Sequence, residues 1–326
     1  MNGSTLPPAS ATTGSFELVV PSSAAGERLD RALPVLVPEL TRSQGKRLID
    51  LGRIAVDGAR PKPGTILRGG QRLRIEPLAP AEPSVEPEAI PVDVLYRDDD
   101  VIVVDKPANL VVHPAAGHAR GTLVNALAHL GVAGGDPGRP GIVHRLDRGT
   151  SGVMVVARNV VVHARLAEQF QRHLVEKIYA AIVVGDPPDE LRIETLFSRH
   201  RVDRQRFTSR TTRGRTAITS FRTRERAASC ALLDVLLGTG RTHQIRVHLS
   251  EHGWSILGDP VDGRAPRDAA LRRIAEALGR PALHARSLAF DHPRSGERVR
   301  FEAPLPRDIL DAWNALRALG APPPVR

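Results

Sequence analysis

The stretch PGIVHRLDRGTSGVMVVARN, Pro140 to Asn159, joins a dense group of polar residues to an apolar run. The run, Val153 to Ala157, has the composition of a buried strand. Asp147 stands between two arginines, and because nearby cations favour the charged form of a carboxyl group, we expect it to stay ionised. Such a carboxylate, held rigidly beside a core strand, can act as a nucleophile or stabilise a cation. A structural salt bridge or a capping role explains this stretch equally well.

Composition is that of a globular protein with a polyanionic partner. The chain has 326 residues, 41% of them hydrophobic and 25% charged, which is enough for one large domain or two. Lys and Arg number 46 against 36 Asp and Glu, giving a net charge of +10, which favours nucleic acid over a membrane surface. The single cysteine, Cys230, excludes an intrachain disulfide and a cysteine metal cage. The N-terminus lacks a signal-peptide pattern and no apolar run reaches membrane length, so we expect a cytoplasmic protein.

Pro, Glu and Ala dominate one segment near residue 80, and this segment divides the chain. We expect a disordered tail at 1–14, a small domain at 15–77, a linker at 78–90, a large domain at 91–320 and a tail at 321–326. In the small domain, a strand at 16–20 precedes two helices, the second capped by Thr41 and ended by Gly52. Short strands with tight turns follow. The polar face of this domain is basic, and its candidate RNA-binding residues are Arg28, Arg42, Lys46, Arg47 and Arg53.

The large domain reads as hairpins with interspersed helices. Expected strand pairs lie at 92–106, 216–237 and 282–302, with further strands at 152–157 and 177–185. Expected helices lie at 121–131, after an Asn159 cap, at 242–253, at 266–279 and at about 307–319. This pattern predicts an α+β fold with a mixed or antiparallel sheet.

Motifs for nucleotide, metal or serine-hydrolase chemistry are missing. The sequence has no G-x-x-x-x-G-K-[ST] phosphate loop and no G-x-S-x-G elbow. His243 and His248 are five residues apart, which does not place them on one helix face, so we expect no zinc pair.

Two other stretches favour a catalytic reading of Asp147. EKIYAAIV contains Tyr179, one of two tyrosines in the chain, and a tyrosine can stack on a base and take part in proton transfer. Core packing is the simpler role for a tyrosine on a strand. LLGTGRTHQIRVHL places donors at a helix start, which suits phosphates or base edges but also a solvated helix face. These donors are Arg241, His243, Gln244 and Arg246.

HRLDRGTSG, EKIYAA, GTGRTHQIRVH and LHARSLAFDHP, in this order, resemble the RluA family of pseudouridine synthases. DKPANLVVHPAAGHARGTLVNAL matches the segment that precedes the catalytic motif in that family, so the resemblance covers about Val92 to Pro304. ERLDRAL and SQGKRLIDLGRIAVDG resemble an S4 RNA-binding domain. The pairing, with PGIVHRLD, is most similar to the branch of the family that acts on large-subunit ribosomal RNA.

The resemblance implies roles for individual residues. Asp147 matches the catalytic aspartate, Tyr179 the tyrosine that stacks on the base, and Arg241 a basic residue that pairs with the catalytic acid. Arg145 matches the arginine that fills the space left by the flipped uridine. The remaining candidate RNA contacts are His144, Arg148, Thr150, His243, Gln244 and Arg246. The chain departs from the family at Asn109, usually glycine, and at Asp262, usually tyrosine. Asparagine tolerates left-handed backbone geometry, so we expect Asn109 to be accommodated.

The implied reaction is the isomerisation of uridine to pseudouridine in RNA, which gains and loses no atom and needs no cofactor or metal. Asp147 could attack the sugar, attack the ring or deprotonate the sugar, and the sequence does not choose among these. The expected substrate is 23S ribosomal RNA, and the expected state is a monomer. A tRNA substrate, or a non-catalytic RNA-binding factor for ribosome assembly, is the alternative.

Overall fold

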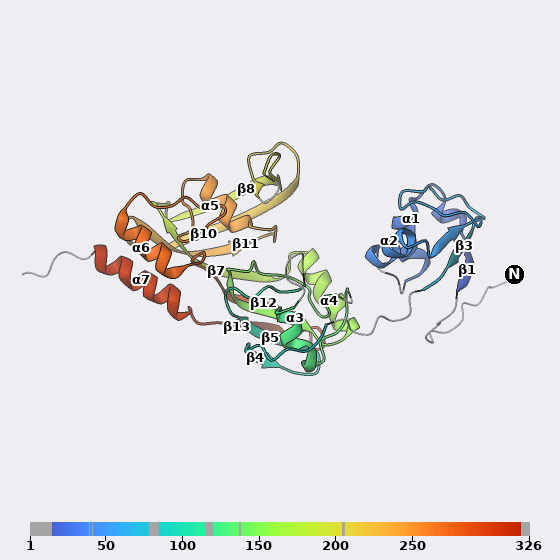
Figure 1. Ribbon diagram of the computed structural model, residues 1–326, viewed down its shortest axis with the longest axis horizontal. Coiled ribbons are helices and arrows are strands. Elements are labelled where there is room, and N and C mark those ends of the chain that lie inside the picture. The colour runs from blue at the N-terminus through green and yellow to red at the C-terminus, as the bar shows by residue number, and fades with distance from the viewer. Residues whose placement is uncertain are drawn as a thin grey trace, which may run out of the picture. The chain divides into compact units, whose positions relative to one another are not determined.

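The computed structural model describes residues 15–38, 40, 42–77, 85–114, 120–136, 138–203 and 206–320 (Figure 1). Their contacts divide the chain into two units, one ending at Ser84 and the other beginning at Val85. The predicted tails and the predicted Thr41 cap lie outside the described residues.

The first unit packs two helices against a small sheet. Its elements are β1 (Phe16–Val19), η1 (Ser22–Ala24), α1 (Leu29–Leu36), α2 (Arg42–Asp50), β2 (Ile54–Val56) and β3 (Arg72–Ile75). The strands pair antiparallel in the order β1-β3-β2. Leu33 of α1, Ile49 of α2 and Leu73 of β3 are buried together in its core. Gly52, with φ +71°, stands just past the end of α2 as predicted.

The end of the predicted linker packs on the second unit. Val85 is buried, and the Glu88 amide donates to the Asn125 carbonyl at 3.1 Å. The Asn125 side chain donates to the Glu86 carbonyl at 2.9 Å. Residues 85–90, which the sequence assigned to the linker, therefore belong to the second unit, and 78–84 lie outside the described residues.

The second unit is built on one large mixed sheet, which confirms the α+β prediction. The strand order is β4-β5-β6-β12-β7-β11-β10-β8-β9, with β13 beside β12. The strands are β4 (Asp93–Arg97), β5 (Val101–Lys106), β6 (Ser151–Ala157), β7 (Glu176–Val184), β8 (Glu190–Arg199), β9 (Phe207–Thr208), β10 (Arg215–Ala227), β11 (Cys230–Leu237), β12 (Leu283–Asp291) and β13 (Arg298–Glu302). Of these, β8 and β9 were not predicted.

The helices of this unit are α3 (Leu123–Leu127), η2 (Ala128–Leu130), α4 (Val160–Gln171), α5 (Gln244–Glu251), α6 (Ala269–Leu278) and α7 (Arg307–Gly320). Asn159 caps α4 as expected, since its side chain accepts from the Val162 amide at 2.9 Å. Helices α6 and α7 pack on each other beside the sheet (Figure 1). Among the described residues, none of the helices has the length and apolar character required to cross a membrane.

Strand alternation gives the sheet two apolar faces. Val103 and Val155 face one core, which includes Leu166 of α4. Ile102 and Met154 face the other, which includes Trp313 of α7. Because β5 and β6 are covered on both sides, they read in the sequence as continuous apolar runs.

The strand that follows the Asp147 loop joins the sheet through an unusually close contact. β6 pairs with β12 in parallel, Ser151 opposite His284 and Gly152 opposite Ala285, whereas the other pairings between the named strands are antiparallel. The Ser151 hydroxyl and His284 Nδ1 are 2.9 Å apart. Gly152 has φ +120°, and a Cβ there would lie 2.2 Å from the Ala285 carbonyl oxygen. Only glycine fits, which explains the glycine that ends the HRLDRGTSG motif.

We predict that Gly152→Ala destabilises the protein by about 2 kcal/mol or more, because β12 must move and a strained φ must be kept. Gly240→Ala is the control, since a Cβ at Gly240 would meet no atom within 4 Å. Denaturation of both variants measures the difference. Equal stability of the two variants would contradict the close approach.

Candidate active site

Asp147 lies in the loop that enters β6, and buried residues fix this loop. The Thr150 amide donates to the Asp147 carbonyl at 3.0 Å, closing a turn. Lys106, fully buried at the end of β5, donates through Nζ to the carbonyls of Pro107 and Leu110 at 2.8 and 2.9 Å. The same Nζ is 3.5 Å from the Arg148 carbonyl. Burial lowers the pKa of Lys106 to about 7, and the Asp147 charge opposes this shift.

His144 anchors the loop from its other side. The Val155 amide donates to His144 Nε2 at 3.1 Å, and the ring stacks on Phe170 with centroids 4.5 Å apart. Burial, together with the Lys177 charge, lowers the pKa of His144 to about 3. Its ring is therefore neutral and is used by the fold, and the RNA contact predicted for it stays a prediction.

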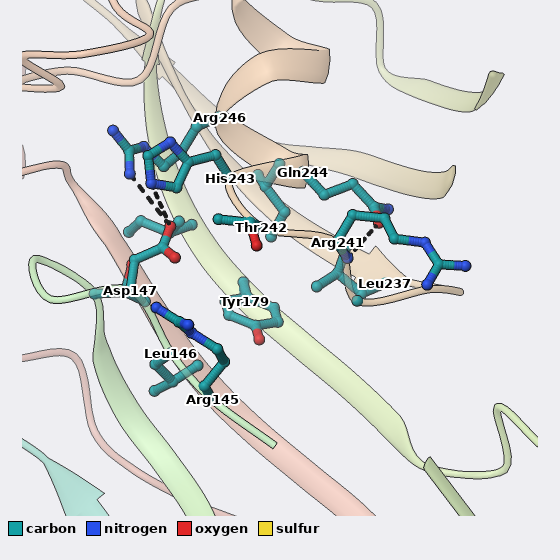
Figure 2. A pocket seen from close by; sticks show the side chains of 14 residues that line it. Arg145, Leu146, Asp147, Tyr179, Leu237, Arg241, Thr242, His243, Gln244 and Arg246 are labelled. Carbon is teal, nitrogen blue, oxygen red and sulfur yellow. Dashed lines mark hydrogen bonds and ion pairs between the residues drawn. The ribbon is translucent and has the colours of Figure 1, made fainter. Parts of the chain in front are cut away.

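The ionic partner of Asp147 is Arg246, not Arg241. Arg246 NH1 is 3.2 Å from Asp147 Oδ2 (Figure 2). The other edge of the guanidinium donates to both oxygens of Asp259, each at 2.7 Å. Arg246 and Asp259 are buried, while the Asp147 side chain is 19% exposed. This corrects the pairing expected for Arg241, whose guanidinium points away from Asp147 and donates to the Thr216 carbonyl at 3.2 Å (Figure 2).

The backbone before α5 decides which donor faces inward. His243 has φ +58°, and the helix begins only at Gln244. The Gln244 amide group is fully used by the fold: its Oε1 accepts from Thr239 and from the Arg241 amide, and its Nε2 donates to Ile218 and Thr219. Gln244 and Arg246 are thus buried groups that the fold uses, and both line the pocket described below; the RNA contacts predicted for them stay predictions.

Asp262, where the family usually has tyrosine, adds a third carboxylate to this cluster. It is buried, and its Oδ2 lies 3.3 Å from Arg246 NH2. His243 Nδ1 is 2.7 Å from the same oxygen, but the two atoms do not form a hydrogen bond. His243 Nε2 is 3.8 Å from Asp147 Oδ2, so the imidazole lies between two carboxylates. Sequence reasoning missed Lys106, Asp259 and this use of Asp262, because burial and partners do not show in the sequence.

Asp147 and Tyr179 line one small pocket, of about 100 Å³, together with Leu237 and Leu283 (Figure 2). Tyr179 is buried in β7, and its pKa lies above the ordinary value for tyrosine because of burial and then the Asp147 charge. Its hydroxyl has no hydrogen-bond partner among the described residues. The pocket therefore combines an aromatic ring, a neutral hydroxyl and a charge-compensated carboxylate.

The other residues predicted to contact RNA differ in how exposed they are. Arg145 and Arg148 are exposed on the loop, and Arg145 lines the pocket, whereas Thr150 is buried in the wall. Asn109 has φ +65°, the left-handed geometry that was expected.

The basic residues of the first unit mostly have acidic partners. Arg28 and Arg42 donate to the two oxygens of Asp30 at 2.9 and 2.8 Å. The Arg28 hydrogen bond, followed by that of Arg42, lowers the pKa of Asp30 to about 2. Lys46 pairs with Asp50 at 3.3 Å and Arg53 with Glu76 at 3.9 Å. Arg47 has no such partner among the described residues.

A possible metal-binding group lies away from this pocket. Asp98, Asp100 and His292 bring three ligand atoms together. Both carboxylates already accept hydrogen bonds from the protein. Arg294 donates to both oxygens of Asp100, and the Tyr96 hydroxyl donates to Asp98. The donor set therefore fits a structural ion-pair cluster better than a metal site.

Comparison with known proteins gives two family matches. Residues 100–251 match the RNA pseudouridylate synthase family, and residues 27–73 match the S4 domain. The chain is 44% identical to ribosomal large subunit pseudouridine synthase D of Xanthomonas campestris, over 92% of each chain. It is 42% identical to the protein of the same name from Pseudomonas aeruginosa, over 91% of this chain and 94% of that one. Among solved structures, human RNA pseudouridylate synthase domain containing 4 is 26% identical, with a TM-score of 0.54 over 69% of this chain and 93% of that one.

We predict that Arg246→Gln lowers stability by about 3–5 kcal/mol, because it leaves buried carboxylates without a counter-charge. Arg241→Gln is the matched control and should leave stability nearly unchanged, because its guanidinium makes no ion pair among the described residues. Thermal and denaturant unfolding of the two variants give the comparison. A larger loss for Arg241→Gln would show that the partners of Asp147 are misassigned.

Proposed function

Because the chain belongs to the RNA pseudouridylate synthase family and is an RNA pseudouridine synthase, we propose that it modifies uridines of the large-subunit (23S) ribosomal RNA. The curated relatives named for that activity match over nearly the whole chain, S4 domain included. The site retains a carboxylate, its cationic partner and a tyrosine in one pocket, which favours an enzyme over a non-catalytic assembly factor. No observation favours tRNA.

The observation that carries the proposal is the Asp147 carboxylate, fixed by Arg246 at 3.2 Å beside the ring of Tyr179. In the isomerisation the glycosidic carbon–nitrogen bond breaks, the uracil turns, and a carbon–carbon bond forms in its place. The proton on that ring carbon is lost and one nitrogen gains a proton, so the reaction balances without a co-reactant. Asp147 is the group placed to act on the nucleoside, and Arg246 compensates its charge without leaving the buried cluster.

The uridine must leave its stack to enter the pocket, at a cost of a few kcal/mol. Tyr179 would stack on the flipped base, which recovers about 1–3 kcal/mol. Arg145, exposed at the pocket edge, would occupy the space that the base leaves in the RNA. The neutral Tyr179 hydroxyl is placed to take part in the final proton transfer.

The S4 unit would supply affinity away from the chemistry, through contacts with RNA phosphates. Arg47 is available for this, and Arg28 and Arg42 of the same unit remain about half exposed although they bind Asp30. We propose that the protein acts as a monomer in the cytoplasm.

Mapping pseudouridines in total RNA of a deletion strain, with and without the restored gene, tests the substrate. We predict that wild type restores the missing large-subunit sites and that Asp147→Asn restores none, because the carboxylate cannot be replaced by an amide. The Asn variant should fold and bind RNA nearly as wild type does, since Arg246 keeps Asp259. Missing sites confined to tRNA, or full restoration by the Asn variant, would refute the respective part of the proposal.

We predict that Tyr179→Phe binds RNA as wild type does but turns over about a hundredfold more slowly or worse, because the ring is kept and a positioned proton-transfer group is lost. Tyr179→Ala should also lose about 1–3 kcal/mol of binding. Single-turnover kinetics and RNA titrations separate the two effects. Near-normal turnover by the Phe variant would assign the proton transfer to another group.

A further inference from the structure

We propose that a groove adjoining the active-site pocket binds a phosphodiester of the substrate RNA next to the target uridine, with Lys177 as its central ligand. This inference rests on the proposed function, since it assumes that the uridine enters the pocket of Asp147. The groove has a volume of about 500 Å³ and shares Arg145, Tyr179 and Arg241 with that pocket. A ligand in the groove is therefore continuous with one in the pocket.

Lys177 is a buried cation without a counter-charge. Lys177 belongs to β7 and is only 8% exposed as a residue, yet its side chain has no hydrogen-bond or ion-pair partner among the described residues. Its neighbour Glu176 is paired with Arg300. Burial alone lowers the pKa of Lys177, to about 8. An unpaired ammonium that is largely removed from water is unfavourable, and an anion bound in the groove would supply the missing counter-charge.

The groove around Lys177 carries further cations and no acid. Among the residues that the structure describes, Arg145 and Arg215 have no acidic partner, and the Arg241 guanidinium makes only its bond to the Thr216 carbonyl. These positive charges also affect one another. Burial and then the charges of Lys177 and Arg241 lower the pKa of His173. Burial and then the charge of Arg215 lower the pKa of Arg241. Elsewhere in the second unit, arginines such as Arg226 and Arg317 are paired with carboxylates. The groove thus concentrates positive charge that the protein itself leaves uncompensated.

The geometry and donor chemistry favour a nucleotide phosphate. Lys177 and Tyr179 are two residues apart on one strand, so their side chains point to the same face about 7 Å apart. A phosphate on Lys177 is then within reach of a nucleotide whose base stacks on Tyr179. Lysine and arginine side chains only donate hydrogen bonds, and a phosphodiester has only acceptors to offer.

Lys177→Met provides a first test, because it keeps the length of the side chain and removes the charge. Met should leave the thermal stability of the free protein unchanged or raised, since an unpaired buried charge is removed. RNA affinity should fall, and the slope of log affinity against log salt should become shallower by about 1. Arg273→Gln, an exposed residue of α6 outside the groove, controls for net charge and should change neither quantity. Lower stability with an unchanged salt slope would make Lys177 a structural residue and overturn the proposal.

A chemical cycle identifies the phosphate. Oligonucleotides carrying the mapped uridine are made with a neutral methylphosphonate at each flanking position in turn, and their binding to wild type and to Lys177→Met is compared. At one position the substitution should weaken binding to wild type but not to the Met variant. If the methylphosphonate weakens binding equally in both proteins at every position, the proposal is overturned. Stabilisation of wild type by inorganic phosphate would not rescue it, because a free ion can bind without being part of the RNA. Pseudouridine formation is scored separately, so a wild-type protein that binds without reacting counts against the proposed substrate instead.

Discussion

The buried guanidinium of Arg246 holds the site together. One edge is fixed by two bonds to Asp259, and the remaining nitrogen reaches Asp147 from a different part of the chain. A guanidinium stays charged and its donors lie in one plane. The bonds to Asp259 therefore also fix the position of Arg246 NH1, the donor that faces the Asp147 carboxylate. The Asp147 loop and α5 are thus oriented by a single rigid group. Without Asp259, Arg246 would keep only Asp147 and Asp262, at 3.2 and 3.3 Å, and would lose the two bonds that fix its plane, so Asp259 is as necessary to this arrangement as Asp147.

Charged residues in this protein have two kinds of surroundings. In one kind the charges are neutralised by ion pairs within the protein, as in Asp30 with its two arginines or Asp100 with Arg294. The other kind is left open, and it gathers where Lys177 and its neighbours surround the groove beside Tyr179. Net charge does not distinguish these two kinds of surroundings, whereas the presence or lack of an acidic partner does. The overall charge of +10 predicted the class of ligand, but not where it is bound.

Sequence patterns predicted the features that depend on local rules. Asn159 as a cap, Gly52 as a helix end and Asn109 in left-handed geometry all follow from single-residue preferences, and the apolar runs gave the core strands. The partner of Asp147 could not be predicted in this way. Arg241 and Arg246 both stand near the start of α5, and only the turn at His243 and the burial of the helix decide which one faces inward. The buried lysines were missed for the same reason, because burial is a property of the folded chain.

The parallel contact between β6 and β12 links residues that are far apart in the sequence, with Ser151 and His284 separated by 133 positions. Arg246 and Asp259 likewise come about a hundred residues after Asp147. A chain emerging from a ribosome exposes the HRLDRGTSG segment early, but the groups that position it are made much later. The nascent protein therefore remains inactive until almost its whole length has been translated. A modifying enzyme produced beside its own class of substrate would in this way act only after its release.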